Sequence, residues 1–168
     1  MRAVAAIAVL LAVAAAAAQA ADSVPSAGPG VASPARARVN WMLKCQGCHR
    51  PDASGSPDTA PAMAGQVARF LSVPGGREYL ARVPGVATAA LPDDQLAELL
   101  NWSLLTFDRA HVPPGFEPYT AEEIGVWRKN PLRTEAPAVR AGLIAALAEQ
   151  DDIRIHQGGH HEKDNPGI

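Results

Sequence analysis

The stretch Cys45-Gln46-Gly47-Cys48-His49 decides how this sequence of 168 residues is interpreted. It places two thiols on either side of two residues and an imidazole directly after the second thiol, and the chain has 2 cysteines in all. A redox-active C-x-x-C pair typically follows a strand in a βαβ unit, whereas a helical pattern leads into this motif. A zinc site needs further Cys or His ligands at matching spacing, and the other histidines do not provide it.

The same spacing is the signature of covalent haem attachment. Two thiols have to reach the two vinyl groups at one edge of a porphyrin, and two intervening residues, one of them glycine, allow the backbone to curl accordingly. The imidazole of the next residue then points over the ring, where it can ligate iron. We therefore expect one covalent haem c, held through Cys45 and Cys48, with His49 as the proximal iron ligand.

A helix is predicted to lead into the motif. Ser33 is suited to be its N-cap, and Pro34 occupies the first helical position, where the missing N–H costs nothing. The helix is expected to run to about Cys45. The residues that we expect on its apolar side are Val39, Met42 and Leu43, with Trp41 nearby.

Helical patterns continue through the rest of the chain, and no strand-like alternation of useful length appears. Apolar residues at helical spacing predict a buried face on the clearest helix, 92–106, which has acidic residues in its first turn. Thr120 and Glu123 form a capping box that opens another helix, which ends near Trp127. Shorter or less regular helices are predicted over 62–73, 78–82 and 134–150. The predicted fold class is therefore all-α.

Three segments between Ala35 and Phe107 make this part of the chain similar to a class I cytochrome c domain. They are a helix that runs into C-Q-G-C-H, the segment Pro61-Ala-Met-Ala-Gly65, and the helical segment from Leu91 to Trp102. The resemblance implies a cytochrome c-like helical domain around one haem. It also implies that the carbonyl of Pro61 accepts a hydrogen bond from His49 and so orients the ring, and that Trp102 packs against the first helix.

The second axial ligand of the iron stays open at this stage. The resemblance implies a methionine in the loop before the last helix, but that loop reads Arg82-Val83-Pro84-Gly85-Val86, with Val83 at the expected position. Met63, the one methionine after His49, is a possible distal ligand, and His111 is an alternative. The third interpretation is an iron without a strong protein ligand on this face. Methionine ligation raises the reduction potential, whereas an open face admits small ligands.

The first residues are typical of a secretory signal peptide. Met1 and Arg2 precede an apolar run that ends at the small-x-small sequence Ala18-Gln19-Ala20. We therefore expect export to the periplasm or another extracytoplasmic space, with no membrane span after signal removal. The predicted parts of the chain are a signal peptide (1–20), a flexible leader (21–33), a cytochrome c-like domain (34–107), a C-terminal helical extension (108–150) and a disordered tail (151–168).

The extension is not part of the small cytochrome c fold. Its apolar residues are expected to pack back on the domain, where the segment would cover the distal haem face or form a partner surface. These residues are Phe116, Tyr119, Ile124, Trp127, Leu132, Leu143, Ile144 and Leu147.

The predicted function is electron transfer by an exported mono-haem cytochrome that serves an extracytoplasmic dehydrogenase or a respiratory chain. The alternative is a haem enzyme, or a cytochrome that binds a gas or a peroxide at an open distal site. We expect a carrier rather than an enzyme, because no set of catalytic side chains stands out. A net charge of −2 without a basic stripe argues against binding to nucleic acid. The expected partners are redox proteins, and the protein is expected to be a monomer.

Overall fold

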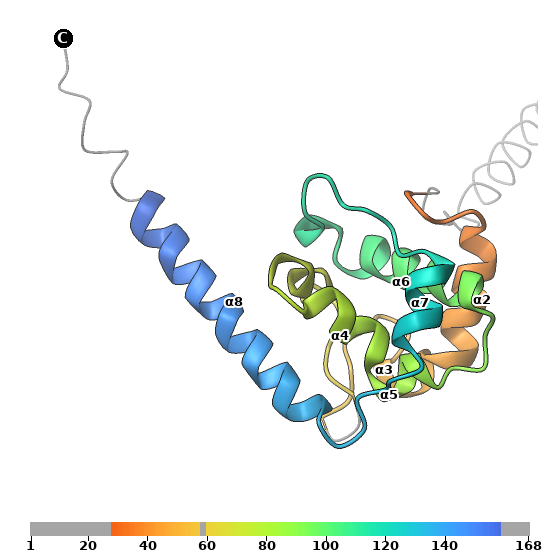
Figure 1. The fold of residues 1–168 in the computed structure, drawn as a ribbon. Helices are drawn as coiled ribbons and strands as arrows, with labels where there is room; N and C mark the ends of the chain where they lie inside the picture. The colour runs from red at the N-terminus through yellow and green to blue at the C-terminus, as the bar shows by residue number, and fades with distance from the viewer. Residues whose placement is uncertain (1–27, 58–59, 159–168) are drawn as a thin grey trace, which may run out of the picture.

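The computed structural model describes residues 28–57 and 60–158, and these residues form helices without any strand. One isolated β-bridge joins Ser56 and Ala60. The all-α fold class is therefore confirmed for this part of the chain (Figure 1). In chain order the helices are α2 (Pro34–Lys44), α3 (Gln46–His49), the 3₁₀ helix η2 (Val67–Ser72), α4 (Gly76–Arg82), α5 (Pro84–Ala87), α6 (Asp93–Phe107), the 3₁₀ helix η3 (Arg109–His111), α7 (Ala121–Trp127) and α8 (Ala136–Gly158).

The predicted signal peptide, residues 1–20, and the leader up to residue 27 lie outside the described residues. Within the described part, none of the helices combines the length and the apolar character that crossing a membrane requires.

Helix α2 begins as predicted, but it buries a different face. The Ser33 hydroxyl accepts a hydrogen bond from the backbone N–H of Arg36, which caps the helix. The side chains of α2 that are buried belong to Ala37, Asn40 and Trp41. The predicted apolar side consisted of Val39, Met42 and Leu43, and these side chains are exposed. The prediction was wrong because α2 meets α6 through a small alanine and one large indole, which leaves the aliphatic side chains outside.

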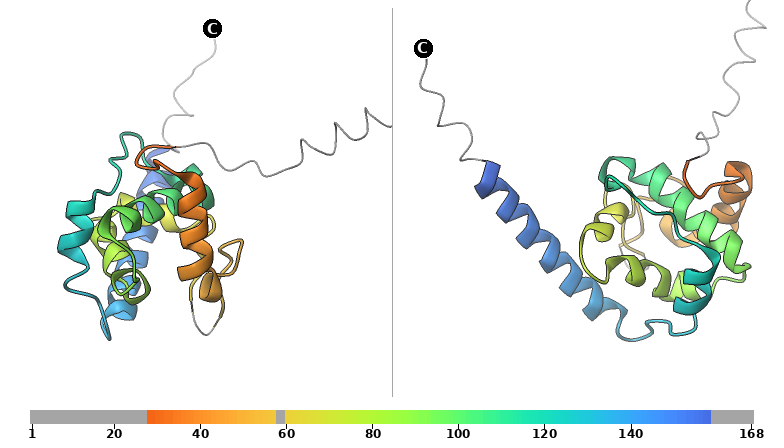
Figure 2. Two further views of the ribbon diagram at one scale, coloured as in Figure 1. Left: turned by 90° about the vertical axis from the view of Figure 1, so that its right-hand side faces the viewer. Right: turned by 45° about the horizontal axis from the view of Figure 1, so that its top comes forward.

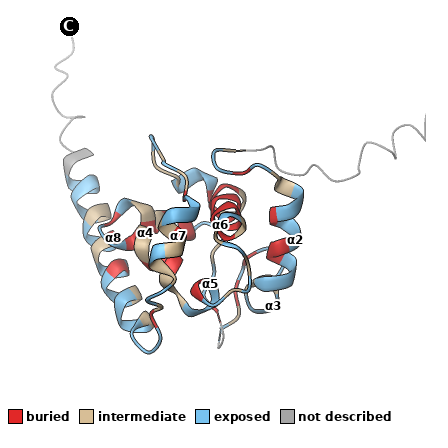
Figure 3. Cartoon of the chain, turned by 45° about the vertical axis from the view of Figure 1, so that its right-hand side comes forward, coloured by how far each residue is buried: buried red, intermediate tan, exposed pale blue. Residues whose placement is uncertain are grey.

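Helix α6 is the centre of the domain and is buried on nearly all sides (Figure 3). The face that the sequence predicts comprises Leu96, Leu99, Leu100, Ser103, Leu104 and Phe107. All are buried except Phe107, which is partly buried. The rings of Trp41 and Trp102 lie 6.3 Å apart, which confirms the predicted contact between the first helix and this one. The buried carboxylate of Glu98 accepts hydrogen bonds from Ser33 N–H and Arg36 Nε, both at 2.7 Å. These bonds compensate the charge and attach the start of α2 to α6.

The extension packs back on the domain, as predicted. Thr120 and Glu123 form the capping box of α7. The buried apolar residues of the extension are Tyr119, Ile124, Leu132, Leu143 and Leu147, and Phe116 and Trp127 are partly buried. Ile144 is 42% exposed, so the prediction that it points inward was wrong. Helix α8 also continues to Gly158, eight residues into the predicted disordered tail, and projects beyond the core (Figure 2).

Arg77 attaches the extension to α4. Its guanidinium donates to both carboxylate oxygens of Glu123, at 3.0 and 2.8 Å, and to the carbonyls of Glu117 and Pro118. It also lies 4.2 Å from the centre of the Tyr119 ring. This is a fork that engages several acceptors together, which a lysine would not match.

Candidate functional site

The C-x-x-C-H sequence forms one helical turn. Cys45 precedes the short helix α3, and the N–H groups of Cys48 and His49 both donate to the Cys45 carbonyl, at 3.2 and 3.0 Å. Positions three and four residues apart lie on the same side of a helix, so the two thiols and the imidazole share one face. Both cysteines are free thiols; Cys48 is exposed and Cys45 is partly buried. The donors of the predicted site are therefore brought together.

The Pro61 carbonyl lies where the resemblance placed it. Nδ1 of His49 is 3.1 Å from the Pro61 oxygen. Because a carbonyl only accepts hydrogen bonds, Nδ1 has to carry the proton, and Nε2 is left with its lone pair. This is the tautomer that an iron ligand requires, so the residues present fit a haem attached at this turn.

The backbone after His49 closes into a tight loop, which we call the proximal loop (residues 50–57 and 60–65). The Gly55 N–H donates to the His49 carbonyl at 2.9 Å, and the N–H groups of Met63 and Ala64 donate to the Ala53 carbonyl at 2.9 and 3.2 Å. Ala53, with φ of 59°, adopts the left-handed conformation that L residues avoid. The loop holds this conformation because hydrogen bonds fix it on both sides.

Burial changes the acidity of two groups at the turn. It raises the pKa of the Cys45 thiol to about 11, with a further contribution from Cys48. It lowers the pKa of His49, against the opposing effect of the hydrogen bond to Pro61. Both shifts favour the neutral forms, and a neutral imidazole is the form that binds a metal.

Of the two candidates for the second axial ligand, Met63 lies in the proximal loop and His111 lies in η3. Met63 is partly buried, two residues after Pro61, and its N–H is bonded to Ala53. His111, in η3, donates from Nδ1 to Oδ1 of the buried Asp108 at 2.5 Å. The other oxygen of Asp108 accepts the N–H of Ala68, at 2.7 Å, just beyond the proximal loop. Neither side chain comes from the segment before α6.

That segment, residues 83–92, which we call the upper loop, is held by an arginine that sequence reasoning missed. Arg128 follows α7 and donates to the carbonyls of Ala87 (3.1 Å), Ala89 and Leu91 (2.8 Å), and to the carboxylate of Asp93 (2.8 Å). Nothing in the local sequence distinguishes Arg128 from a solvated arginine at a helix end, because its acceptors are backbone carbonyls far away in the chain.

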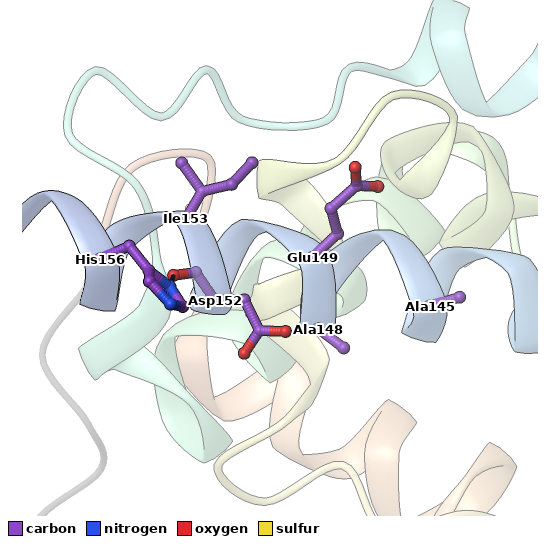
Figure 4. A pocket seen from close by; sticks show the side chains of 6 residues that line it. All are labelled: Ala145, Ala148, Glu149, Asp152, Ile153 and His156. Carbon is purple, nitrogen blue, oxygen red and sulfur yellow. Dashed lines mark hydrogen bonds between the residues drawn. The ribbon is translucent and has the colours of Figure 1, made fainter.

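A shallow depression on α8 is unrelated to this site. Figure 4 shows its lining, which comes entirely from one helix and includes Glu149, Asp152 and His156. Nδ1 of His156 bonds the carbonyl of Asp152 on the same helix. Among the residues that the structure describes, no group of three or more His, Cys, Asp or Glu side chains could hold a metal ion.

Known proteins similar to this chain are cytochromes. No family model matches it. Two proteins named cytochrome c-552, both from Thermus thermophilus, are 35% identical to it over 107 residues, which cover 53% of this chain and 82% and 72% of the relatives. The alignment is 107 positions long, but only 53% of the 168 residues of this chain take part in it, which is fewer than 107. The remaining positions are gaps in this chain, so the relatives contain residues there that this chain lacks. With its all-α fold and its helical C-x-x-C-H turn, the chain belongs to the c-type cytochromes, the haem-binding electron carriers.

Proposed function

We propose that this chain is an exported class I cytochrome with one haem, attached through Cys45 and Cys48 and ligated by His49. The observation that carries the proposal is the hydrogen bond from Nδ1 of His49 to the Pro61 carbonyl, 3.1 Å long, beside a turn with both thiols on one face. The proposal of a single haem is supported by the 2 cysteines of the sequence, which form one C-x-x-C-H motif.

The protein groups have separate tasks. Cys45 and Cys48 would hold the haem through two thioether bonds, each formed by adding one S–H across one vinyl group, which needs no oxidant. His49 would hold the iron through the Nε2 lone pair, and the Pro61 carbonyl would keep the ring in this orientation. The ring of Trp41 lies beside that of His49, with 6.1 Å between the two ring centres. The haem, when bound, supplies one-electron transfer between ferric and ferrous iron.

Residues 1–20 are proposed to direct export, and the partner is proposed to be an extracytoplasmic dehydrogenase or a component of a respiratory chain. The apolar run that ends at Ala18-Gln19-Ala20 supports export. A protein that gains and loses one electron needs a donor and an acceptor in the same compartment, which supports a redox protein as partner.

The test is expression of the full chain together with a bacterial haem-ligation system. We expect a coloured protein whose mass exceeds that of the processed polypeptide by one haem, whose pigment resists acid–acetone extraction, and which is reduced reversibly by one electron. A colourless protein, or pigment that is extracted, would refute the proposal. N-terminal sequencing should give Ala21 as the first residue if the signal peptide is removed as predicted.

Substitutions within the turn provide the controls. Cys45→Ala and Cys48→Ala should each leave one thioether, and the double variant should lose covalent haem altogether. Met42→Leu on α2, at a position that is 48% exposed, should leave attachment unchanged. Normal attachment in the double variant would contradict the assigned roles.

A further inference from the structure

The upper loop offers no side chain that readily ligates haem iron. From Gly76 to Phe107, which includes α4, α5, the upper loop and α6, the sequence contains no Met, His, Cys or Lys. The apolar residues of the upper loop that pack against the core are Val83, Val86, Ala89 and Leu91. Thr88 Oγ1, the one hydroxyl of the loop, donates to the Pro84 carbonyl at 2.6 Å. Apart from Thr88, the side chains of this segment are therefore aliphatic.

The two remaining candidates, Met63 and His111, are engaged in other contacts. Met63 is bonded to Ala53 through its backbone, two residues from the carbonyl that orients His49. His111 is tied to Asp108, which binds the N–H of Ala68, three residues after the proximal loop. To reach iron on the face opposite His49, His111 would have to give up its bond to Asp108, and Met63 would have to turn away from the core against which it packs.

The extension forms hydrogen bonds with both ends of the upper loop. At its start, the Arg82 carbonyl accepts the N–H of Leu132 at 2.8 Å, and Arg82 Nε donates to the Asn130 carbonyl at 2.7 Å. Further along, the guanidinium of Arg128 binds three carbonyls and Asp93, as described above. Figures 1 and 3 both show α5, at the start of the loop, at the same end of the domain as the α3 turn. The extension thus fixes the part of the chain that lies toward the haem-attachment turn.

We propose that the iron of this cytochrome has no side-chain ligand on the face opposite His49, and that Arg128 holds the aliphatic upper loop at that face in place of such a ligand. The vacant axial position then binds small, uncharged ligands such as carbon monoxide or nitric oxide. An aliphatic wall without hydrogen-bond donors favours neutral diatomic molecules over anions, whose desolvation it does not compensate. The proposal rests on the haem attachment proposed above.

The first experiment mixes the ferrous protein, with its haem shown to be covalent, with carbon monoxide in a stopped-flow instrument. We expect complete binding, at a rate that rises in proportion to the carbon monoxide concentration, because no protein ligand has to leave first. A rate that reaches a plateau, or an absence of binding, would show a side-chain ligand and overturn the open site. If the haem is nevertheless covalent and reversibly reducible, the proposed function as an electron carrier is not contradicted by that result.

Two substitutions test the excluded ligands. Met63→Leu and His111→Gln should each leave the optical spectra of both redox states and the carbon monoxide rate unchanged within about twofold, since neither side chain is assigned to the iron. If either variant alone converts an unreactive ferrous protein into one that binds carbon monoxide, that residue is the ligand and the proposal is wrong.

The role of Arg128 is tested by hydrogen exchange of the haem-containing protein. Arg128→Met should lower the protection of the amides in residues 83–92 by about tenfold or more, and Arg128→Lys nearly as much, because an ammonium group cannot engage the same acceptors together. Lys129→Met, at the neighbouring exposed position, is the matched control and should leave protection unchanged. Unchanged protection in both Arg128 variants would overturn the assigned role.

Discussion

The proximal loop and the upper loop are held in different ways. The proximal loop is closed by its own backbone, through bonds from Gly55 to the His49 carbonyl and from Met63 to the Ala53 carbonyl. The upper loop is held mainly by one side chain, Arg128, which lies 37 to 41 residues beyond its carbonyl partners in the chain. The first loop depends on local conformation, and the second depends on whether the extension is docked.

This difference separates two kinds of sensitivity to mutation. A backbone-closed loop fails when a residue cannot adopt the required φ and ψ, or when an added atom meets backbone that cannot move. A loop held by a distant side chain fails when that side chain is lost or when the segment that carries it detaches. The predictions below separate the two cases.

The largest effect is expected from Gly55→Ala in the proximal loop. Gly55 has φ of 77°, and an added Cβ would lie 2.6 Å from the Ala62 nitrogen and 2.7 Å from the Ala60 oxygen and the Pro61 carbonyl carbon. These are backbone atoms of the segment that orients His49, so they cannot move without displacing the Pro61 carbonyl. We expect a loss of about 3 kcal/mol or more in the free energy of unfolding, measured by denaturant unfolding of the haem-containing protein.

Gly65→Ala is the matched control for this prediction. Gly65 also has a positive φ, 65°, but nothing lies within 4 Å of an added Cβ. This substitution should cost only the conformational penalty, about 1 kcal/mol. Equal losses in the two variants would mean that close backbone contact does not determine the behaviour of the proximal loop.

The features that depend on local sequence could be predicted, and those that depend on distant contacts could not. The helical C-x-x-C-H turn, the capping box of Thr120 and the bond from His49 to Pro61 could be predicted, because each depends on residue types at short, fixed spacing. The roles of Arg77 and Arg128 could not, because their acceptors are mostly carbonyls, which every residue carries. The buried face of α2 was mispredicted for a related reason: helical spacing locates a face only when the facing helix is known.

A second, intermediate effect is expected from Asp108→Ala. Asp108 is buried at the end of α6, and its Oδ2 accepts the N–H of Ala68, which is itself fully buried, at 2.7 Å. Removing the carboxylate leaves that N–H without an acceptor, which should cost about 2 kcal/mol. Unfolding of the haem-containing protein measures the loss. Asp108→Asn keeps an oxygen acceptor for the N–H and should be less destabilising; an equal loss would assign the effect to the charge that faces His111.

The smallest effect concerns the docking of α7 as the pH falls. Hydrogen bonds from Arg77 hold the pKa of Glu123 below its usual value of 4.5, and the charges nearby are Arg77 on α4 and Glu117 before α7. Because the pKa is depressed in the folded state, the contact contributes its full stability above about pH 4.5 and loses it as the pH falls through the folded value.

Acidification from neutral pH should therefore lower the hydrogen-exchange protection of the upper loop before that of the proximal loop, since α7 leads directly into Arg128. Glu123 is partly exposed, with 32% of its side chain accessible, so the change that depends on this residue should be modest, roughly two- to fivefold. Glu123→Gln should remove most of this pH dependence and leave the upper loop less protected already at pH 7. If both loops lose protection together in the wild-type protein, the docking of α7 does not control the upper loop separately, and the contrast between the two loops does not hold.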